Sequence, residues 1–78
     1  MIKKRTLEVI QFLNKERLAS YKEIAKELGY QERVIRYEIE RINDELSLSG
    51  FEEIQKLKKG MLMVPDKLDL NQILEEGE

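Results

Sequence analysis

The sequence predicts a mainly α-helical domain that carries a small β-hairpin. Two observations predict this fold class. The stretch from Ser20 to Leu46 has the apolar spacing of two helices, and Gly29 interrupts it where a tight turn would join them. The stretch that follows has apolar positions on both sides of Lys58-Lys59-Gly60, which is typical of two short strands joined by a turn.

The first helix is predicted from Ile2 to Asn14. Its apolar side consists of Thr6, Val9, Ile10 and Leu13, with Phe12 on the flank. This side would close the core against the other helices. The next residues, up to Ala19, are mostly polar and are expected to form a loop.

The second helix is predicted to begin after Ser20. Glu23 follows Ser20 by three residues, so each side chain can bond the backbone amide of the other in a capping box. The apolar side then consists of Tyr21, Ile24, Ala25 and Leu28. Gly29 is expected to end this helix in the left-handed conformation.

The third helix is predicted from Gln31 to Leu46. At about 100° per residue, one side collects Ile35, Ile39, Ile42 and Leu46 and should face the core. The opposite side collects Arg33, Arg36, Tyr37 and Glu40. An arginine fork can pair with a guanine edge or a phosphate, and an α-helix fits the major groove, so this exposed strip is a candidate DNA-reading surface.

A plainer interpretation of the same strip is an ordinary salt-bridged helix surface. Glu32 precedes Arg36 by four residues and Glu40 follows it by four. Such pairs stabilise a helix by a few tenths of a kcal/mol each and imply no ligand. The strip alone does not decide between the two interpretations.

The hairpin is predicted as a strand over Phe51 to Leu57, a turn at Lys58-Lys59-Gly60 and a strand over Met61 to Val64 that Pro65 ends. Ile54 and Leu57 are its inward candidates. A hairpin after two helices joined by a tight turn predicts a winged helix-turn-helix, with three helices and a two-stranded wing. Lys58 and Lys59 would then lie near the DNA backbone, although a Lys-Lys-Gly turn is also common on any protein surface.

Composition limits the classes of function. The chain has 78 residues with no cysteine and no histidine, which removes the disulfide framework, the usual metal ligands and the usual general base. We therefore expect no enzyme activity, no metal, no cofactor and no small-molecule ligand in this domain. Neither a long apolar run nor a signal-type segment is present, so we expect a soluble, cytoplasmic protein without membrane contact.

We expect the chain to divide into a DNA-binding domain at 1–65 and an acidic C-terminal segment at 66–78. The first 65 residues hold 13 basic and 11 acidic side chains, so this part carries +2 although the chain carries −2. DNA-binding domains are usually more basic than this. Affinity for DNA would therefore depend on local clustering of the basic side chains.

The segments LGYQERVIRYEIERIN and GFEEIQKLKKGMLMVP resemble the N-terminal winged helix-turn-helix domain of bacterial sugar-operon regulators, typified by the mannitol and lichenan operon activators. The resemblance spans roughly residues 5 to 65, and a group of virulence regulators is also similar. It implies operator binding by a domain that precedes regulatory domains phosphorylated by the sugar phosphotransferase system. Those further domains could also join two chains in a homodimer.

The arginines and tyrosine of the family motif fall on Arg33, Arg36 and Tyr37. The sequence departs from the family at Gln31, where many relatives have Ser or Thr, and at Val34, where they have Thr. Gln31 can still bond a base or phosphate, and Val34 can pack on a thymine methyl group. The expected function is thus sequence-specific binding of double-stranded DNA by a regulator of carbohydrate uptake or utilisation genes; the alternative is a winged-helix module that binds protein.

Overall fold

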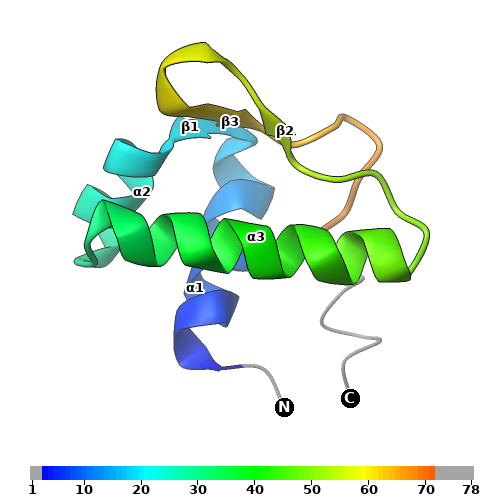
Figure 1. The fold of residues 1–78 in the computed structure, drawn as a ribbon, viewed down its shortest axis with the longest axis horizontal. Helices are drawn as coiled ribbons and strands as arrows, with labels where there is room; N and C mark the ends of the chain where they lie inside the picture. The colour runs from blue at the N-terminus through cyan, green and yellow to red at the C-terminus, as the bar shows by residue number, and fades with distance from the viewer. Residues whose placement is uncertain (1–2, 72–78) are drawn as a thin grey trace.

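The computed structural model describes residues 3–71. In this part of the chain the order of elements is α1 (Lys4–Glu16), β1 (Leu18–Ser20), α2 (Tyr21–Leu28), α3 (Glu32–Leu48), β2 (Gln55–Lys56), a 3-10 turn (Lys58–Gly60) and β3 (Met61–Met63). Figure 1 shows α3 crossing in front of α1, with α2 beside the first turns of α3 and the strands above the helices in this view. The fold is mainly helical with a small antiparallel sheet.

The helix boundaries follow local signals in the sequence. The Ser20 side chain accepts a hydrogen bond from the Glu23 amide, and the Glu23 carboxylate accepts one from the Ser20 amide, which confirms the predicted capping box. Gly29 ends α2 with a φ of 79°, as expected for a left-handed helix end. The α1 helix runs two residues past the predicted end at Asn14, and Ile2, its predicted start, lies outside the described residues.

The sheet has three strands in the order β1-β3-β2, rather than the two strands that we predicted. The stretch expected to be a loop contains β1, which pairs antiparallel with β3 through Leu18 opposite Met63 and Ser20 opposite Met61. The Val64 amide continues the pairing by donating to the Arg17 carbonyl oxygen at 2.7 Å. A strand of three residues has too short an alternation to be recognised before its partner is known.

The hairpin also differs from its prediction in detail. Only Gln55–Lys56 pairs with β3, so the first strand is shorter than expected. Ile54 is buried as predicted, but Leu57 is 45% exposed and does not face the core. Gly60 has the expected positive φ of 72°, and Lys59 also has a positive φ of 61°.

The core lies between the three helices and the inner face of the sheet. It contains Ile10, Leu13, Ile24, Ile35, Ile39, Ile42 and Leu46, which confirms the apolar sides that helical spacing predicted. Ala19 and Leu62, which are partners in the β1–β3 pairing, close it from the sheet. Leu68 and Leu70 also belong to this core. The packing therefore continues past Pro65 into the acidic segment, of which residues 72–78 lie outside the described range.

Candidate nucleic-acid interface

The outer side of α3 presents the predicted strip to solvent. Arg33, Arg36 and Tyr37 are all exposed, and the Tyr37 side chain is 54% accessible. Gln31 stands at the N-cap of α3 without capping it; instead its side-chain oxygen accepts a hydrogen bond from Arg33 Nε at 3.0 Å. Two of the predicted site residues are thus joined at the beginning of the helix.

The Arg36 guanidinium lies over the ring of Tyr21, with 4.3 Å between Cζ and the ring centroid. Within residues 3–71 it makes no ion pair with Glu32 or Glu40, so the predicted salt-bridged alternative is wrong for this arginine. A cation over an aromatic face is held by the ring quadrupole, and this contact leaves the N–H groups of the guanidinium without an anionic partner.

Glu40 pairs instead with Lys56 of β2. The hydrogen bond to the Glu40 carboxylate raises the pKa of Lys56 above its ordinary value, against a smaller opposing effect of burial. This pair joins α3 to the hairpin. It also engages one of the two carboxylates that border the arginines along the strip.

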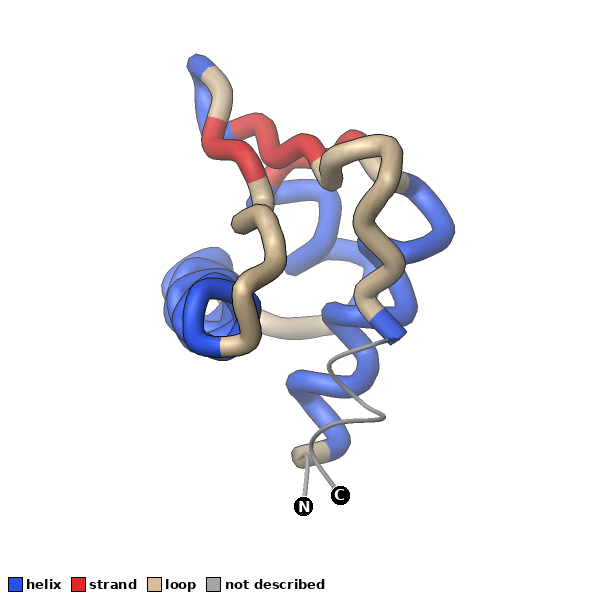
Figure 2. The backbone as a smooth tube through the Cα atoms, turned by 90° about the vertical axis from the view of Figure 1, so that its right-hand side faces the viewer, coloured by secondary structure: helices blue, strands red, loops and turns tan. Residues whose placement is uncertain are grey.

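Lys58 and Lys59 are exposed at the tip of the hairpin. Both views show this tip projecting above the helices, and Figure 2 shows it on the same side of the molecule as α3 (Figures 1 and 2). The lysines and the arginine strip can therefore both be reached by one extended, negatively charged ligand.

The two other predicted contacts, Val34 and Tyr37, differ in exposure. Val34 is partly buried, so a limited part of its side chain is available for an apolar contact. Tyr37 has Arg41 near its ring, with 5.8 Å from the arginine Cζ to the ring centroid. Arg41 adds an exposed cation one turn further along α3 that the sequence had not singled out.

Several polar contacts fix α3 relative to the rest of the molecule. Glu38, which is fully buried, accepts hydrogen bonds from Arg5 Nε at 2.8 Å and from the Thr6 hydroxyl at 2.5 Å. Asn43 accepts from the Ile54 amide at 2.7 Å and donates to the Ile54 carbonyl oxygen at 3.4 Å. These bonds attach α3 to α1 on one side and to the hairpin on the other.

Tyr30 attaches the turn before α3 to α1 through a hydrogen bond. The Tyr30 hydroxyl donates to the Glu8 carboxylate of α1, with 2.5 Å between the oxygens. The same hydrogen bond, followed by burial, raises the pKa of Tyr30 above its ordinary value of 10.0. The beginning of α3 is thereby held against α1.

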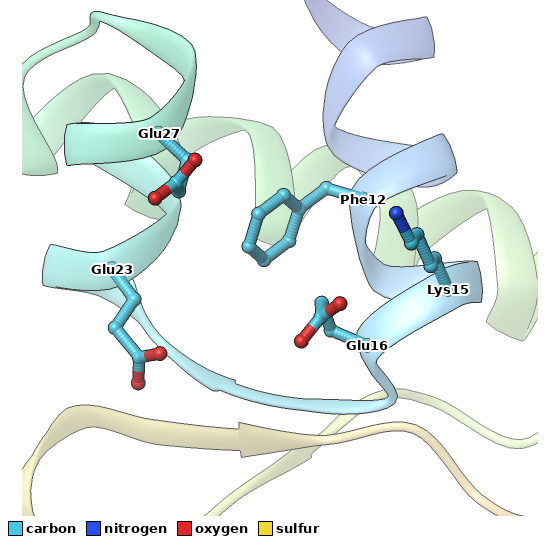
Figure 3. Close-up of a pocket in the computed structure, with 5 residues that line it drawn as sticks. All are labelled: Phe12, Lys15, Glu16, Glu23 and Glu27. Atoms are coloured by element: carbon cyan, nitrogen blue, oxygen red, sulfur yellow. The ribbon is translucent and has the colours of Figure 1, made fainter.

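A hollow of about 390 Å³ lies between α1 and α2. Phe12, Lys15 and Glu16 line it from α1, and Glu23 and Glu27 line it from α2, with the Phe12 ring directed into the gap (Figure 3). Three carboxylates at this hollow make it unsuited to a nucleic acid. The carboxylates gathered here belong to α1 and α2, whereas Glu32, Glu40, Asp44 and Glu45 are exposed on α3 itself.

Sequence reasoning missed Tyr21 and Lys56 as contributors to this surface, and it missed the buried Asn43 that holds the hairpin to α3. Tyr21 was assigned to the apolar side of α2, and its burial agrees with that assignment, but its ring also carries Arg36. No local signal reveals such a contact, because its two partners lie on different helices. For Asn43 the sequence does contain a local signal. It follows the buried Ile42 and precedes Leu46 by three residues, which places a polar group at the edge of the core.

Comparisons with protein-family models, with curated proteins and with solved structures found no match for this chain. Among the described residues, the structure has no group of three or more side chains that could hold a metal ion. No helix in the same range is long and apolar enough to cross a membrane.

Proposed function

We propose that this chain is a winged helix-turn-helix domain that binds double-stranded DNA in a sequence-specific manner. In this arrangement α2 and α3 form the helix-turn-helix, α3 enters the major groove, and the hairpin is the wing beside it. The observation that carries the proposal is Arg36, which is exposed, unpaired with any carboxylate in residues 3–71, and held between α2 and α3 by the Tyr21 ring. An unpaired arginine held in this way is suited to acceptors on DNA.

The distribution of charge supports the same proposal. Lys58 and Lys59 at the wing tip lie on the same side as α3, where they could contact phosphates that flank the groove. Because Glu40 is engaged by Lys56, it repels a phosphate less than a free carboxylate would. The resemblance to sugar-operon regulators agrees with this function and suggests a cytoplasmic transcription regulator of carbohydrate genes.

The experiment begins with a duplex selected from a random library by the wild-type domain. Wild type and Arg36→Ala are then titrated against this duplex and against a scrambled one at a single salt concentration, since affinity for DNA depends steeply on salt. Lys15→Ala is the control, because it removes one positive charge from the hollow between α1 and α2.

If Arg36 reads a base, Arg36→Ala loses about 1 to 3 kcal/mol on the selected duplex and much less on the scrambled one. If it binds a phosphate, the two losses are equal. Lys15→Ala binds both duplexes as wild type does. Undiminished affinity of Arg36→Ala for both duplexes, or no selection by the wild type, would contradict the proposal.

A second candidate function is a protein-interaction module with the same fold. The hollow with Phe12 at its centre favours it, because a half-buried aromatic ring surrounded by Glu16, Glu23 and Glu27 is suited to a basic peptide. If the domain is such a module, Arg36→Ala should not change its affinity for either duplex. The same titrations therefore separate the two candidates.

A further inference from the structure

Tyr21 lies where three elements meet. It is the first residue of α2, its ring lies under the Arg36 guanidinium of α3, and it borders the hairpin turn. A Cβ atom at Gly60 would lie 3.6 Å from Tyr21 Cδ2, so the ring and the turn are in close proximity. Tyr21 is only 6% exposed. The ring is therefore a fixed platform between the helices and the wing.

The Tyr21 ring is the contact that orients Arg36. Among residues 3–71, the guanidinium has neither a carboxylate partner nor a side-chain hydrogen bond. An arginine in open solvent samples many rotamers, and a ligand must restrict them when it binds. Because its Cζ lies 4.3 Å from the ring centroid, the guanidinium is restricted by the ring while it has no anionic partner within residues 3–71.

We propose that Tyr21 is a positioning residue of the DNA interface, which holds the Arg36 fork in the orientation that pairs with the O6 and N7 atoms of a guanine. The proposal rests on the proposed DNA-binding function and names the base that this site recognises. A guanine edge presents two acceptors in one plane, so a pre-oriented fork discriminates it from other bases. Arg36 lies in the second turn of α3, and the N-terminal part of such a helix reaches the base edges.

A purely structural role for Tyr21 predicts different behaviour. A buried aromatic residue at the start of a helix stabilises the fold whether or not it carries an arginine. Tyr21→Phe keeps the ring, whereas Tyr21→Leu keeps an apolar side chain and removes the aromatic face. Thermal melting of each variant sets a temperature at which all of them are folded, and binding is measured there.

The binding experiment uses the duplex selected by the wild type and its scrambled counterpart. We expect Tyr21→Phe to bind both within about twofold of wild type, and Tyr21→Leu to lose about fivefold on the selected duplex only, the size of a cation–π contact. In an Arg36→Ala background, Tyr21→Leu should cause no further loss. A Tyr21→Leu that binds like wild type, or that loses equally with and without Arg36, overturns the positioning role.

The guanine assignment has its own test. Each guanine of the selected duplex is replaced in turn by 7-deazaguanine, which lacks the N7 acceptor. We expect one guanine at which this replacement weakens binding of the wild type and does not weaken binding of Arg36→Ala. If no position behaves in this way, Arg36 does not read a guanine and the assignment is overturned.

A measurement without DNA separates this inference from the proposed function. In the free domain, the ring current of Tyr21 should shift the side-chain proton signals of Arg36 upfield in NMR spectra. The shift should persist in Tyr21→Phe and disappear in Tyr21→Leu. If the wild type binds DNA but its Arg36 signals show no upfield shift, the positioning role of Tyr21 is overturned and the proposed function is not. If the signals are shifted but the domain selects no duplex, the proposed function is overturned, and with it the role of Tyr21 in binding DNA.

Discussion

At the scale of single residues, the most informative side chain is Glu38. In the described part of the chain it is the only charged residue in the core, where its two hydrogen bonds join α3 to Arg5 and Thr6 of α1. A buried carboxylate is costly unless donors satisfy it. Glu38 follows Ile35 by three residues, so helical spacing alone places it on the core side. Sequence reasoning did not count Glu38 as a core residue because it is charged, although its spacing from Ile35 indicated a buried position.

Replacing Arg5 with Ala should destabilise the fold by about 2 to 3 kcal/mol, because the buried Glu38 carboxylate would keep only the Thr6 hydroxyl. The expected loss of stability is smaller than for a fully buried ion pair, because the Arg5 side chain is 33% exposed. The measurement is the free energy of unfolding in urea. Lys4→Ala is the matched control, as it removes a neighbouring exposed charge and should change stability by less than about 0.5 kcal/mol. Equal stability of the two variants would contradict the role of Arg5.

Tyr30 predicts a dependence on alkaline pH. Its hydrogen bond to Glu8 raises the pKa of the phenol in the folded state, so the fold favours the protonated form. This contribution to stability is fully present below pH 10, the ordinary pKa of tyrosine, and is lost as pH rises through the higher pKa of the folded state.

The comparison of wild type with Tyr30→Phe isolates this effect. The difference in melting temperature should be constant between about pH 7 and 9 and should narrow above about pH 10. Lys56 has a raised pKa as well, but it contributes equally to both proteins and cancels in the difference. A difference that stays constant up to about pH 11.5 would show that the phenol proton is not what Glu8 holds.

At the scale of elements, α3 and the hairpin behave as one unit because side chains of α3 hold the hairpin. Asn43 bonds both backbone groups of Ile54, and Glu40 pairs with Lys56. The two residues of β2 are themselves exposed, so apolar burial of β2 contributes little to this attachment. In the proposed DNA complex, the wing would therefore keep a fixed position relative to the groove that α3 enters.

Replacing Lys58 and Lys59 with Ala should weaken binding to selected and scrambled duplexes alike, because phosphate contacts carry no sequence information. The slope of log affinity against log salt concentration should fall by about 1 to 2 units, according to how many phosphates the two lysines neutralise. The control pair is Lys15→Ala with Lys67→Ala, two exposed lysines outside the proposed interface. An unchanged slope in the wing variant would exclude the wing from the interface.

The elements also show what the sequence could and could not predict. The three helices were predictable because capping at Ser20, the stop at Gly29 and the apolar spacing are all local signals. The β1 strand was not, because its pairing depends on β3, far away in the sequence. The same distinction holds for the site: exposure of Arg33 and Arg36 followed from periodicity, whereas the contact of Arg36 with the Tyr21 ring depends on packing between helices.

At the scale of the whole molecule, the positive charge of the proposed interface is local, because exposed Glu32, Asp44 and Glu45 also lie on α3. The hollow between α1 and α2 holds Glu16, Glu23 and Glu27, whereas Arg36 lies on α3 and Lys58 at the projecting wing tip (Figures 2 and 3). A net charge of −2 is therefore compatible with the proposed DNA-binding function, because the field near a surface depends on local charge. The low total charge limits non-specific attraction and places more of the affinity on a few side chains.

The segment after β3 closes the molecule against α1. Arg17 donates to the carbonyl oxygens of Pro65 at 2.7 Å and of Asp66 at 3.1 Å, and Asn14 accepts from the Leu70 amide at 3.2 Å. Leu68 and Leu70 are buried in the common core. The sequence prediction ended the DNA-binding domain at residue 65, whereas the buried core includes these two leucines beyond that boundary.

A chain that ends at Pro65 should consequently be much less stable than one that ends at Asn71. Burial of a leucine contributes about 1.5 to 3 kcal/mol, so loss of Leu68 and Leu70 removes about 3 to 6 kcal/mol. A small domain has a total stability of about 5 to 15 kcal/mol, and the shorter chain should be partly or largely unfolded at 25 °C. Thermal melting of chains 1–65, 1–71 and 1–78 measures this. Leu70→Ala in the full chain is the milder variant and should cost about 2 to 5 kcal/mol. If 1–65 melted like 1–71 and Leu70→Ala like wild type, the segment would cover the core without stabilising it, and the domain would end where the sequence alone had placed its boundary.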